Sequence, residues 1–141
     1  MNARTTALSA LIAVRRQNAW ADGALKEYIA RDRLSRRDAA LAARLVYGVV
    51  QNRLLLDFDL AQVVSSPLAK LQPVVLDILR LGAYQILFLD KIPVSAAVNE
   101  AVEQTKTYAN KRAAGLVNGS LRALARQKDT LAAPQDLATK Y

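Results

Sequence analysis

Apolar residues recur along this chain at intervals of three and four, which is the spacing of one face of an α-helix. The first such segment covers residues 5–19 and the second covers residues 24–30, with Asp22 and Gly23 predicted to separate them. A third helix is predicted to begin at Ser35, because a serine hydroxyl can cap the first turn of a helix. Its apolar face continues to about Asn52, where we expect a bend.

The rest of the chain continues the helical pattern. Residues 65–67 contain a proline that ends one helix, and Pro73 suits the first position of the next, which is nearly all apolar. These four segments are predicted as helices: residues 52–64, 73–89, 95–108 and 112–127. The sequence therefore predicts an all-α fold, a helical bundle of about seven helices.

Length and composition agree with this fold class. The 141 residues suit one domain, and the 52% hydrophobic content comes with only 6% aromatic residues, 5 Gly and 4 Pro. An all-β fold is excluded on this composition, because strands favour aromatic and β-branched residues.

Two residue types are missing altogether. The chain has no Cys and no His, which excludes disulfides, thiolate or imidazole metal sites, and catalysis by Ser-His-Asp or Cys-His groups. We therefore expect no metal site, and any catalysis would have to rest on carboxylates, lysine or tyrosine; no catalytic residue is predicted among them. No apolar run approaches the length that crosses a bilayer, so we expect no membrane partner and a cytoplasmic location.

The charge is strongly basic. Twenty Lys and Arg against 12 Asp and Glu give a net charge of +8 and a pI near 10.1. The excess lies toward both ends of the sequence, and the two ends would form one basic surface if they packed side by side. Such a charge favours an anionic partner, with nucleic acid first. An ordinary soluble surface rich in arginine is the alternative.

Four short segments follow one another in an order that resembles the NusB family. They are LRLGAYQ at residues 79–85, IP at 92–93, AVNEAVE at 97–103 and VNGSLR at 117–122. The resemblance implies an all-helical fold of two packed subdomains and an RNA-binding function.

Further segments resemble the branch of this family found at the N-terminus of RsmB/Sun (Fmu)-type 16S rRNA (cytosine-5) methyltransferases. They are Arg37-Asp38, LVYGVV at 45–50 and Leu56-Asp57. This resemblance implies a NusB-like RNA-binding domain over residues 1–131 and the start of a linker over residues 132–141. It also implies small-subunit rRNA as partner, together with the protein's own C-terminal methyltransferase domain.

The catalytic part of such an enzyme is not expected within this sequence. The methyltransferases use S-adenosylmethionine and a cysteine nucleophile, whereas this chain has no Cys and no Gly-rich strand-to-helix turn. The resemblance therefore implies S-adenosylmethionine as cofactor of the parent enzyme and none for this chain, which alone is not an enzyme.

Basic residues on the first and last helices are the candidate RNA-binding groups. Arg4 and Arg15 stand at the two ends of an apolar stripe, along which an arginine can extend so that its guanidinium reaches the rim. Arg16 lies on the polar flank of the same helix. The basic N-terminal helix is part of the RNA-binding face in NusB-like proteins, so the resemblance implies that role here.

The last helix carries a second set of candidates. Lys111, Asn118 and Arg122 share one helical face, with Arg126 slightly further round, as in a stripe that follows phosphates. An ordinary solvated face would look the same. Lys106 and Arg112 flank the break before this helix, and the resemblance implies RNA contact there.

Carboxylates and aromatic residues have simpler interpretations. The pairs Asp57/Asp59 and Glu100/Glu103 are predicted to be solvated helix charges that partner Arg53 or Lys106 rather than an acid–base site. Tyr47 and Tyr84 are predicted to pack in the core. Two alternatives to rRNA positioning stay open: a free transcription antitermination factor of the NusB type, and a protein-docking module for the catalytic domain.

Overall fold

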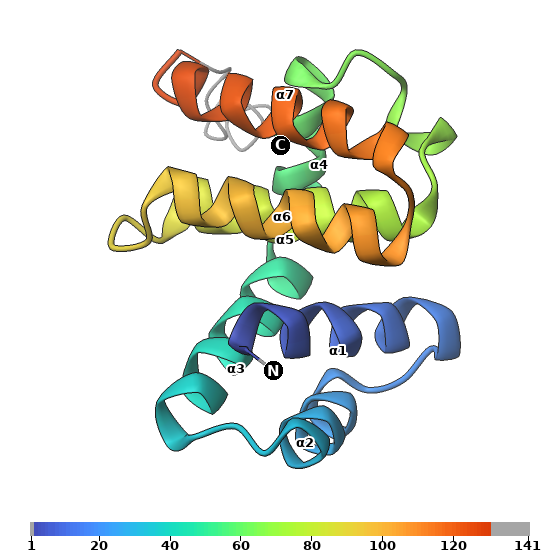
Figure 1. Ribbon diagram of the computed structural model, residues 1–141, viewed down its shortest axis with the longest axis vertical. Coiled ribbons are helices and arrows are strands. Elements are labelled where there is room, and N and C mark those ends of the chain that lie inside the picture. The colour runs from blue at the N-terminus through green and yellow to red at the C-terminus, as the bar shows by residue number, and fades with distance from the viewer. Residues whose placement is uncertain (1, 131–141) are drawn as a thin grey trace, which may run out of the picture. The chain divides into compact units, whose positions relative to one another are not determined.

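The computed structural model describes residues 2–130 and is all-helical within them (Figure 1). Seven α-helices and one short 3-10 helix follow in chain order: α1 (Ala3–Gln17), α2 (Ala21–Asp32), α3 (Arg36–Gln51), α4 (Arg53–Val63), η1 (Leu68–Lys70), α5 (Pro73–Phe88), α6 (Val94–Tyr108) and α7 (Lys111–Gln127). The predicted all-α fold class is confirmed. The tail predicted as a linker lies outside the described residues.

The chain divides into two compact units, Met1–Gln51 and Asn52–Tyr141. In the first unit α1 packs against both α2 and α3. In the second, α5 contacts α4, α6 and α7, so α5 is the central helix of that unit. The division falls at the predicted bend, because Asn52 leaves the helical conformation with φ −111° and ψ 18°.

Each unit has its own apolar core. The core of the first unit includes fully buried side chains from α1 and α3: Leu8, Leu45 and Val46. The core of the second unit is built around α5, whose predicted apolar character is reflected in ten buried residues. Gly82 of α5 allows a close approach to α7, because a Cβ added there would lie 2.6 Å from Leu121 Cδ1 of that helix.

Several helix starts are fixed by side chains or by proline, including that of α1, where the Asn2 side chain accepts from the Thr5 amide at 2.9 Å. The Ser35 hydroxyl accepts a hydrogen bond of 3.1 Å from the Asp38 amide and so caps α3, as predicted. Pro73 occupies the first turn of α5, also as predicted, where its missing N–H costs nothing. The Asn110 side chain accepts from the Ala113 amide at 2.8 Å and caps α7.

One predicted boundary is wrong. Asp22 and Gly23 were expected to separate two helices, but both lie inside the first turn of α2. A carboxylate there interacts favourably with the helix dipole, and the Tyr47 hydroxyl of α3 donates a hydrogen bond to Asp22. Helix α2 therefore begins directly after Trp20, which is extended and 87% exposed.

Candidate nucleic-acid interface

Helix α7 presents a row of cationic side chains to solvent. Lys111, Arg122 and Arg126 are all exposed, while Val117, Leu121 and Leu124 of the same helix are buried. At 100° per residue the three cations fall within about 60° of one another. They extend over about 22 Å of helix axis at 1.5 Å per residue. The three predicted cations therefore lie on one exposed face of α7, with half-buried Asn118 between Lys111 and Arg122.

Asn118 takes part in this row by holding one of its cations. The Arg122 Nε donates to Asn118 Oδ1 at 2.9 Å, across one turn of the helix. This bond uses one of the five guanidinium N–H donors and leaves the others for a ligand. Asn118 thus restricts Arg122 to one part of the exposed face.

Two glycines lie between these cations on the same side of α7. Gly115 and Gly119 are exposed, and a Cβ added to either would meet no other atom within 4 Å. Internal packing therefore does not require glycine at either position. The helix backbone is consequently open to close approach between Lys111 and Arg122.

Of the two candidates beside the α6–α7 connection, Lys106 has an acidic partner and Arg112 has none within the described residues. Lys106, on the last turn of α6, pairs with Glu103 at 3.6 Å, as predicted, and both side chains are exposed. Such an exposed pair partly offsets the lysine charge and contributes little to stability. Arg112 is exposed at the second residue of α7, with no acidic partner among the described side chains.

The α1 candidates belong to the other unit and are less available. Arg4 and Arg15 are half-buried, and each already interacts with another part of the chain. Arg16 is exposed, as expected for the polar flank. Of the three, Arg16 alone has a guanidinium with no interaction within the described residues.

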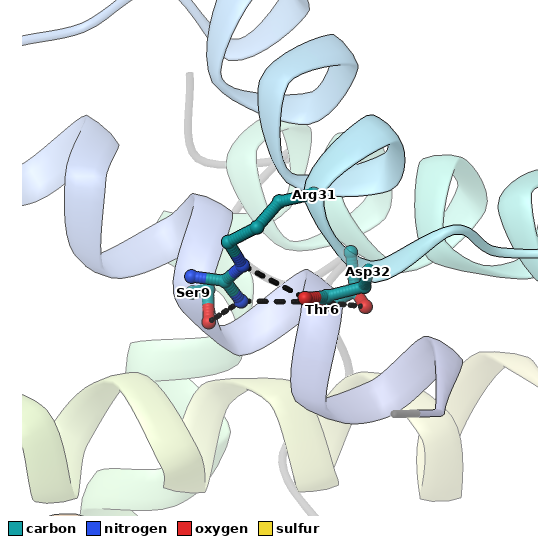
Figure 2. A network of polar contacts seen from close by, with 4 residues as sticks. All are labelled: Thr6, Ser9, Arg31 and Asp32. Carbon is teal, nitrogen blue, oxygen red and sulfur yellow. Dashed lines mark hydrogen bonds and ion pairs between the residues drawn. The ribbon is translucent and has the colours of Figure 1, made fainter.

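Polar contacts on the inner side of α1 hold it to α2 (Figure 2). Arg31 forms a two-bond pair with Asp32, at 2.7 Å from Nε and 3.0 Å from Nη2, and also reaches the Ser9 hydroxyl at 3.3 Å. The Thr6 hydroxyl donates to Asp32 at 2.7 Å. The Arg31 hydrogen bond, with that of Thr6, lowers the pKa of Asp32. Arg31 is therefore a structural arginine.

The carboxylates of α4 are not solvated charges, and that prediction is wrong. Asp57 accepts two hydrogen bonds from Arg80 of α5, at 2.7 and 2.9 Å, so it partners a different arginine from the one expected. Asp59 is 5% exposed, and burial raises its pKa. Its weak hydrogen bond comes from the Gln62 amide at 3.5 Å. Asp57 therefore joins α4 to α5, whereas Asp59 is a buried carboxylate held within α4.

The tyrosines also differ from each other. Tyr84 is buried and stacks on Phe88 with ring centroids 5.2 Å apart, which agrees with the predicted core role. Tyr47 is only half-buried, and its hydrogen bond to Asp22 raises its pKa. Tyr47 therefore joins α3 to α2 at the edge of the core.

A further basic group lies on α3 and the turn before it, where no site was predicted from the sequence. Its members are exposed arginines: Arg33, Arg36, Arg37 and Arg44. The seven-residue interval between Arg37 and Arg44 was the available signal, since residues seven apart share a helical face.

Residues 2–130 provide neither a metal site nor a membrane span. No group of three or more Asp or Glu side chains is arranged to hold a metal ion there. None of the described helices is both long and apolar enough to cross a bilayer.

Comparison with known proteins identifies relatives for most of the chain. The model of the NusB family matches residues 1–126. The probable ribosomal RNA small subunit methyltransferase B of Bacillus subtilis is 40% identical over 88% of this chain and 28% of its own length. The transcription antitermination protein NusB of Ruminiclostridium cellulolyticum is 33% identical over 84% of this chain and 82% of its own. The chain thus spans less than a third of that methyltransferase.

Solved structures share the arrangement of helices. T. maritima NusB superposes with a TM-score of 0.81 at 25% identity, covering 95% of this chain and 92% of that one. A chain from the complex of antitermination factors NusB and NusE with dsRNA gives a TM-score of 0.80 at 24% identity, covering 88% and 93%. At this identity the second likeness concerns the fold alone.

Proposed function

The chain belongs to the NusB family, and from this premise we propose that it is an RNA-binding domain that holds small-subunit rRNA for a methyltransferase. The observation that carries the proposal is the exposed cationic row of α7, formed by Lys111, Arg122 and Arg126. Lysine and arginine side chains bind phosphate oxygens, and such contacts fix the position of an RNA without reading its bases. The domain would act in the cytoplasm.

The choice of rRNA rests on the relatives. Two proteins named as small-subunit rRNA methyltransferase B, from Bacillus subtilis and Synechocystis, are 40% and 34% identical to about nine-tenths of this chain. Methyl transfer is not proposed for this chain, because its sequence has no Cys to supply a thiolate nucleophile and no Gly-rich strand-to-helix turn for S-adenosylmethionine. Affinity and orientation are therefore the contribution proposed for this chain, and the methyl transfer is assigned to another domain.

A salt titration of RNA binding tests the proposal. The two ligands are a helix-loop from small-subunit rRNA and an unrelated RNA of equal length. We expect tighter binding to the rRNA piece, with a preference that persists as salt is raised. Equal and steeply salt-dependent binding to both, or none, would overturn rRNA positioning and leave a basic module that docks on its catalytic domain.

A charge-matched pair of variants locates the contact. The α7 variant carries Lys111→Gln, Arg122→Gln and Arg126→Gln. The control variant carries three substitutions at exposed lysines outside the proposed surfaces: Lys26→Gln, Lys70→Gln and Lys91→Gln. The slope of log K against log salt should fall by about 0.7–0.9 for each phosphate that the α7 variant no longer binds. Equal slopes in the two variants would rule out this face.

A second candidate function is that of a free antitermination factor. It is favoured by the 82% of the Ruminiclostridium cellulolyticum NusB length that this chain covers. A solved NusB is described together with NusE and dsRNA. Adding purified NusE separates the two functions: it should raise RNA affinity if the chain is an antitermination factor and leave it unchanged if the chain positions rRNA.

A further inference from the structure

The first unit carries a basic surface of its own, separate from the candidates on α1. It consists of Arg33, at the end of α2, and Arg36, Arg37 and Arg44 on α3; we call it the α3 surface (Figure 1 shows the two helices). All four side chains are exposed, and none of the guanidinium groups has a hydrogen bond or ion pair within the described residues. Arg31 and Arg80, in contrast, are both held by aspartates.

Acidic side chains of the same unit do not neutralise this surface. Asp22 accepts from Tyr47, and Asp32 is held by Arg31 and Thr6. Glu27 is exposed on α2 and forms no ion pair with any of these arginines within the described residues. Asp38 is half-buried on the side of α3 that carries Leu45, about 100° away from Arg37. The four arginines therefore form an uncompensated positive field over roughly two turns of exposed helix and the turn before it.

Three of these arginines stand where fold stability disfavours them. Arg36 and Arg37 are in the first turn of α3, whose positive dipole end disfavours cations. Arg33 is the C-cap of α2, where a cation is favoured by the helix dipole, but its φ of 51° lies in the left-handed region, where glycine is favoured over other residues. Residues that destabilise their own helix or turn, and make no contact within the protein that offsets this cost, are typical of functional sites.

On the basis of the proposed RNA-binding function, we propose that the α3 surface is a second contact surface for the RNA phosphate backbone, distinct from α7. Arginine suits this ligand because its planar fork bonds two phosphate oxygens at once. No exposed aromatic side chain interrupts the α3 row between Arg36 and Arg44, so the surface is built for backbone charge rather than for base stacking. An acidic protein segment is the competing partner.

The test compares variants of equal charge. The α3 variant, Arg36→Gln, Arg37→Gln and Arg44→Gln, is measured beside the α7 variant and the control variant, using an RNA duplex and poly-glutamate as separate probes. We expect the α3 variant to lower the RNA salt slope by about 0.7–0.9 for each phosphate it no longer binds, beyond the effect of the control variant. Circular dichroism should stay at the wild-type level, and the melting temperature should not fall, because the two arginines removed from the first turn of α3 are disfavoured there by the helix dipole.

The outcomes separate this inference from the proposed function. If the α7 variant lowers the slope and the α3 variant matches the control variant, the α3 surface does not bind RNA although the domain still does. If the α3 variant fails to bind poly-glutamate and keeps its RNA slope, the partner is an acidic protein segment and the inference is overturned. If the wild-type chain binds no RNA, both proposals are overturned.

Arg33 provides an independent check, because replacing it by glycine should raise stability and lower RNA affinity at the same time. Arg33→Gly relieves a left-handed arginine and should raise the melting temperature, while removing a phosphate ligand should lower RNA affinity and flatten the salt slope. A purely structural residue would not give a more stable protein that binds more weakly. Higher stability with unchanged RNA affinity would exclude Arg33 from the surface.

Discussion

The buried carboxylate of Asp32 shows how single residues hold the first unit together. Its side chain is 3% exposed, yet it stays ionised because Arg31 and the Thr6 hydroxyl donate to it. These donors lower the pKa of Asp32, so the carboxylate stabilises the fold above the usual aspartate range. That stabilisation disappears as the pH falls through the lowered pKa of the folded state.

Thr6→Val tests this hydrogen bond with little change of shape. The valine cannot donate, and a hydrogen bond to a charged group contributes about 1.5–3 kcal/mol, so the free energy of unfolding should fall by that order at neutral pH. Urea unfolding measures it. The deficit should shrink once acid protonates Asp32, because the missing bond was made to the carboxylate. Thr107→Val, at an exposed position of α6, is the matched control. A deficit independent of pH would contradict the explanation.

Asp57 and Asp59 lie two residues apart on α4 and should respond in opposite ways to the same substitution. Asp57→Asn weakens the two-bond pair with Arg80, whose side chain is only 14% exposed, and should lower the free energy of unfolding. Asp59→Asn removes a charge that burial disfavours, and should raise the free energy of unfolding at neutral pH.

The stability gained by Asp59→Asn should depend on pH, and the direction of the Asp59 pKa shift determines how. Burial raises the pKa of Asp59 in the folded state, so its protonated form stabilises the fold at low pH and this benefit disappears as the pH rises through that pKa. The gain of the variant over wild type should therefore begin above the ordinary aspartate pKa of the unfolded chain and reach its full size above the raised pKa of the folded state. Thermal melts across acid and neutral pH measure the difference, and a gain of equal size throughout would point to a cause other than ionisation.

Glycines on two packed helices give a contrast at the scale of the element. Gly115 of α7 is exposed with nothing near an added Cβ, so Gly115→Ala should stabilise the chain by about 0.5–1 kcal/mol. Gly82→Ala has the same gain in propensity but brings its methyl 2.6 Å from Leu121, which is fully buried. Overpacking costs about 1–3 kcal/mol, so Gly82→Ala should be the less stable variant by that margin. Equal stabilities in urea would contradict the close packing of α5 on α7.

Helices were the part of this fold most open to prediction, because their signals are local. Apolar spacing located each of the seven α-helices within residues 2–130, and Ser35 and Pro73 set two of the starts correctly. The error at Asp22 had a tertiary cause, since the tyrosine that bonds to its carboxylate lies 25 residues later in the chain. Local turn propensity contains no information on such a partner.

The candidate site was less predictable, because it too depends on contacts between residues that are distant in sequence. The shared face of Lys111 and Arg122 follows from helical geometry and was found. Whether an arginine already has a partner within the protein depends on residues distant in sequence. Arg4 and Arg15, for example, both interact within the chain. The pairing of Arg80 with Asp57, 23 residues away, was missed on that account. Free and engaged cations look alike in a sequence, and they differ only once the helices are packed.

At the scale of the whole molecule, positive charge and core size are distributed differently between the two units. The first unit holds the α3 surface and the α1 candidates on only 51 residues. Its core rests on three helices, whereas the second unit surrounds α5 with three other helices. The fraction of surface buried on folding falls as chains become shorter, so the smaller unit has the weaker basis for independent stability.

Separating the chain at the Asn52 break tests this difference. We expect residues 52–141 alone to keep a helical spectrum and to unfold in one cooperative transition, because the core around α5 is intact in that fragment. Residues 1–51 alone should be partly helical and lack a cooperative transition, since a core of this size supplies little net stability. Mutual repulsion among its unpaired arginines should make that fragment more helical as salt is raised. A cooperative melt of residues 1–51 at low salt would show instead that the Arg31–Asp32–Thr6 contacts and the small core suffice without the second unit.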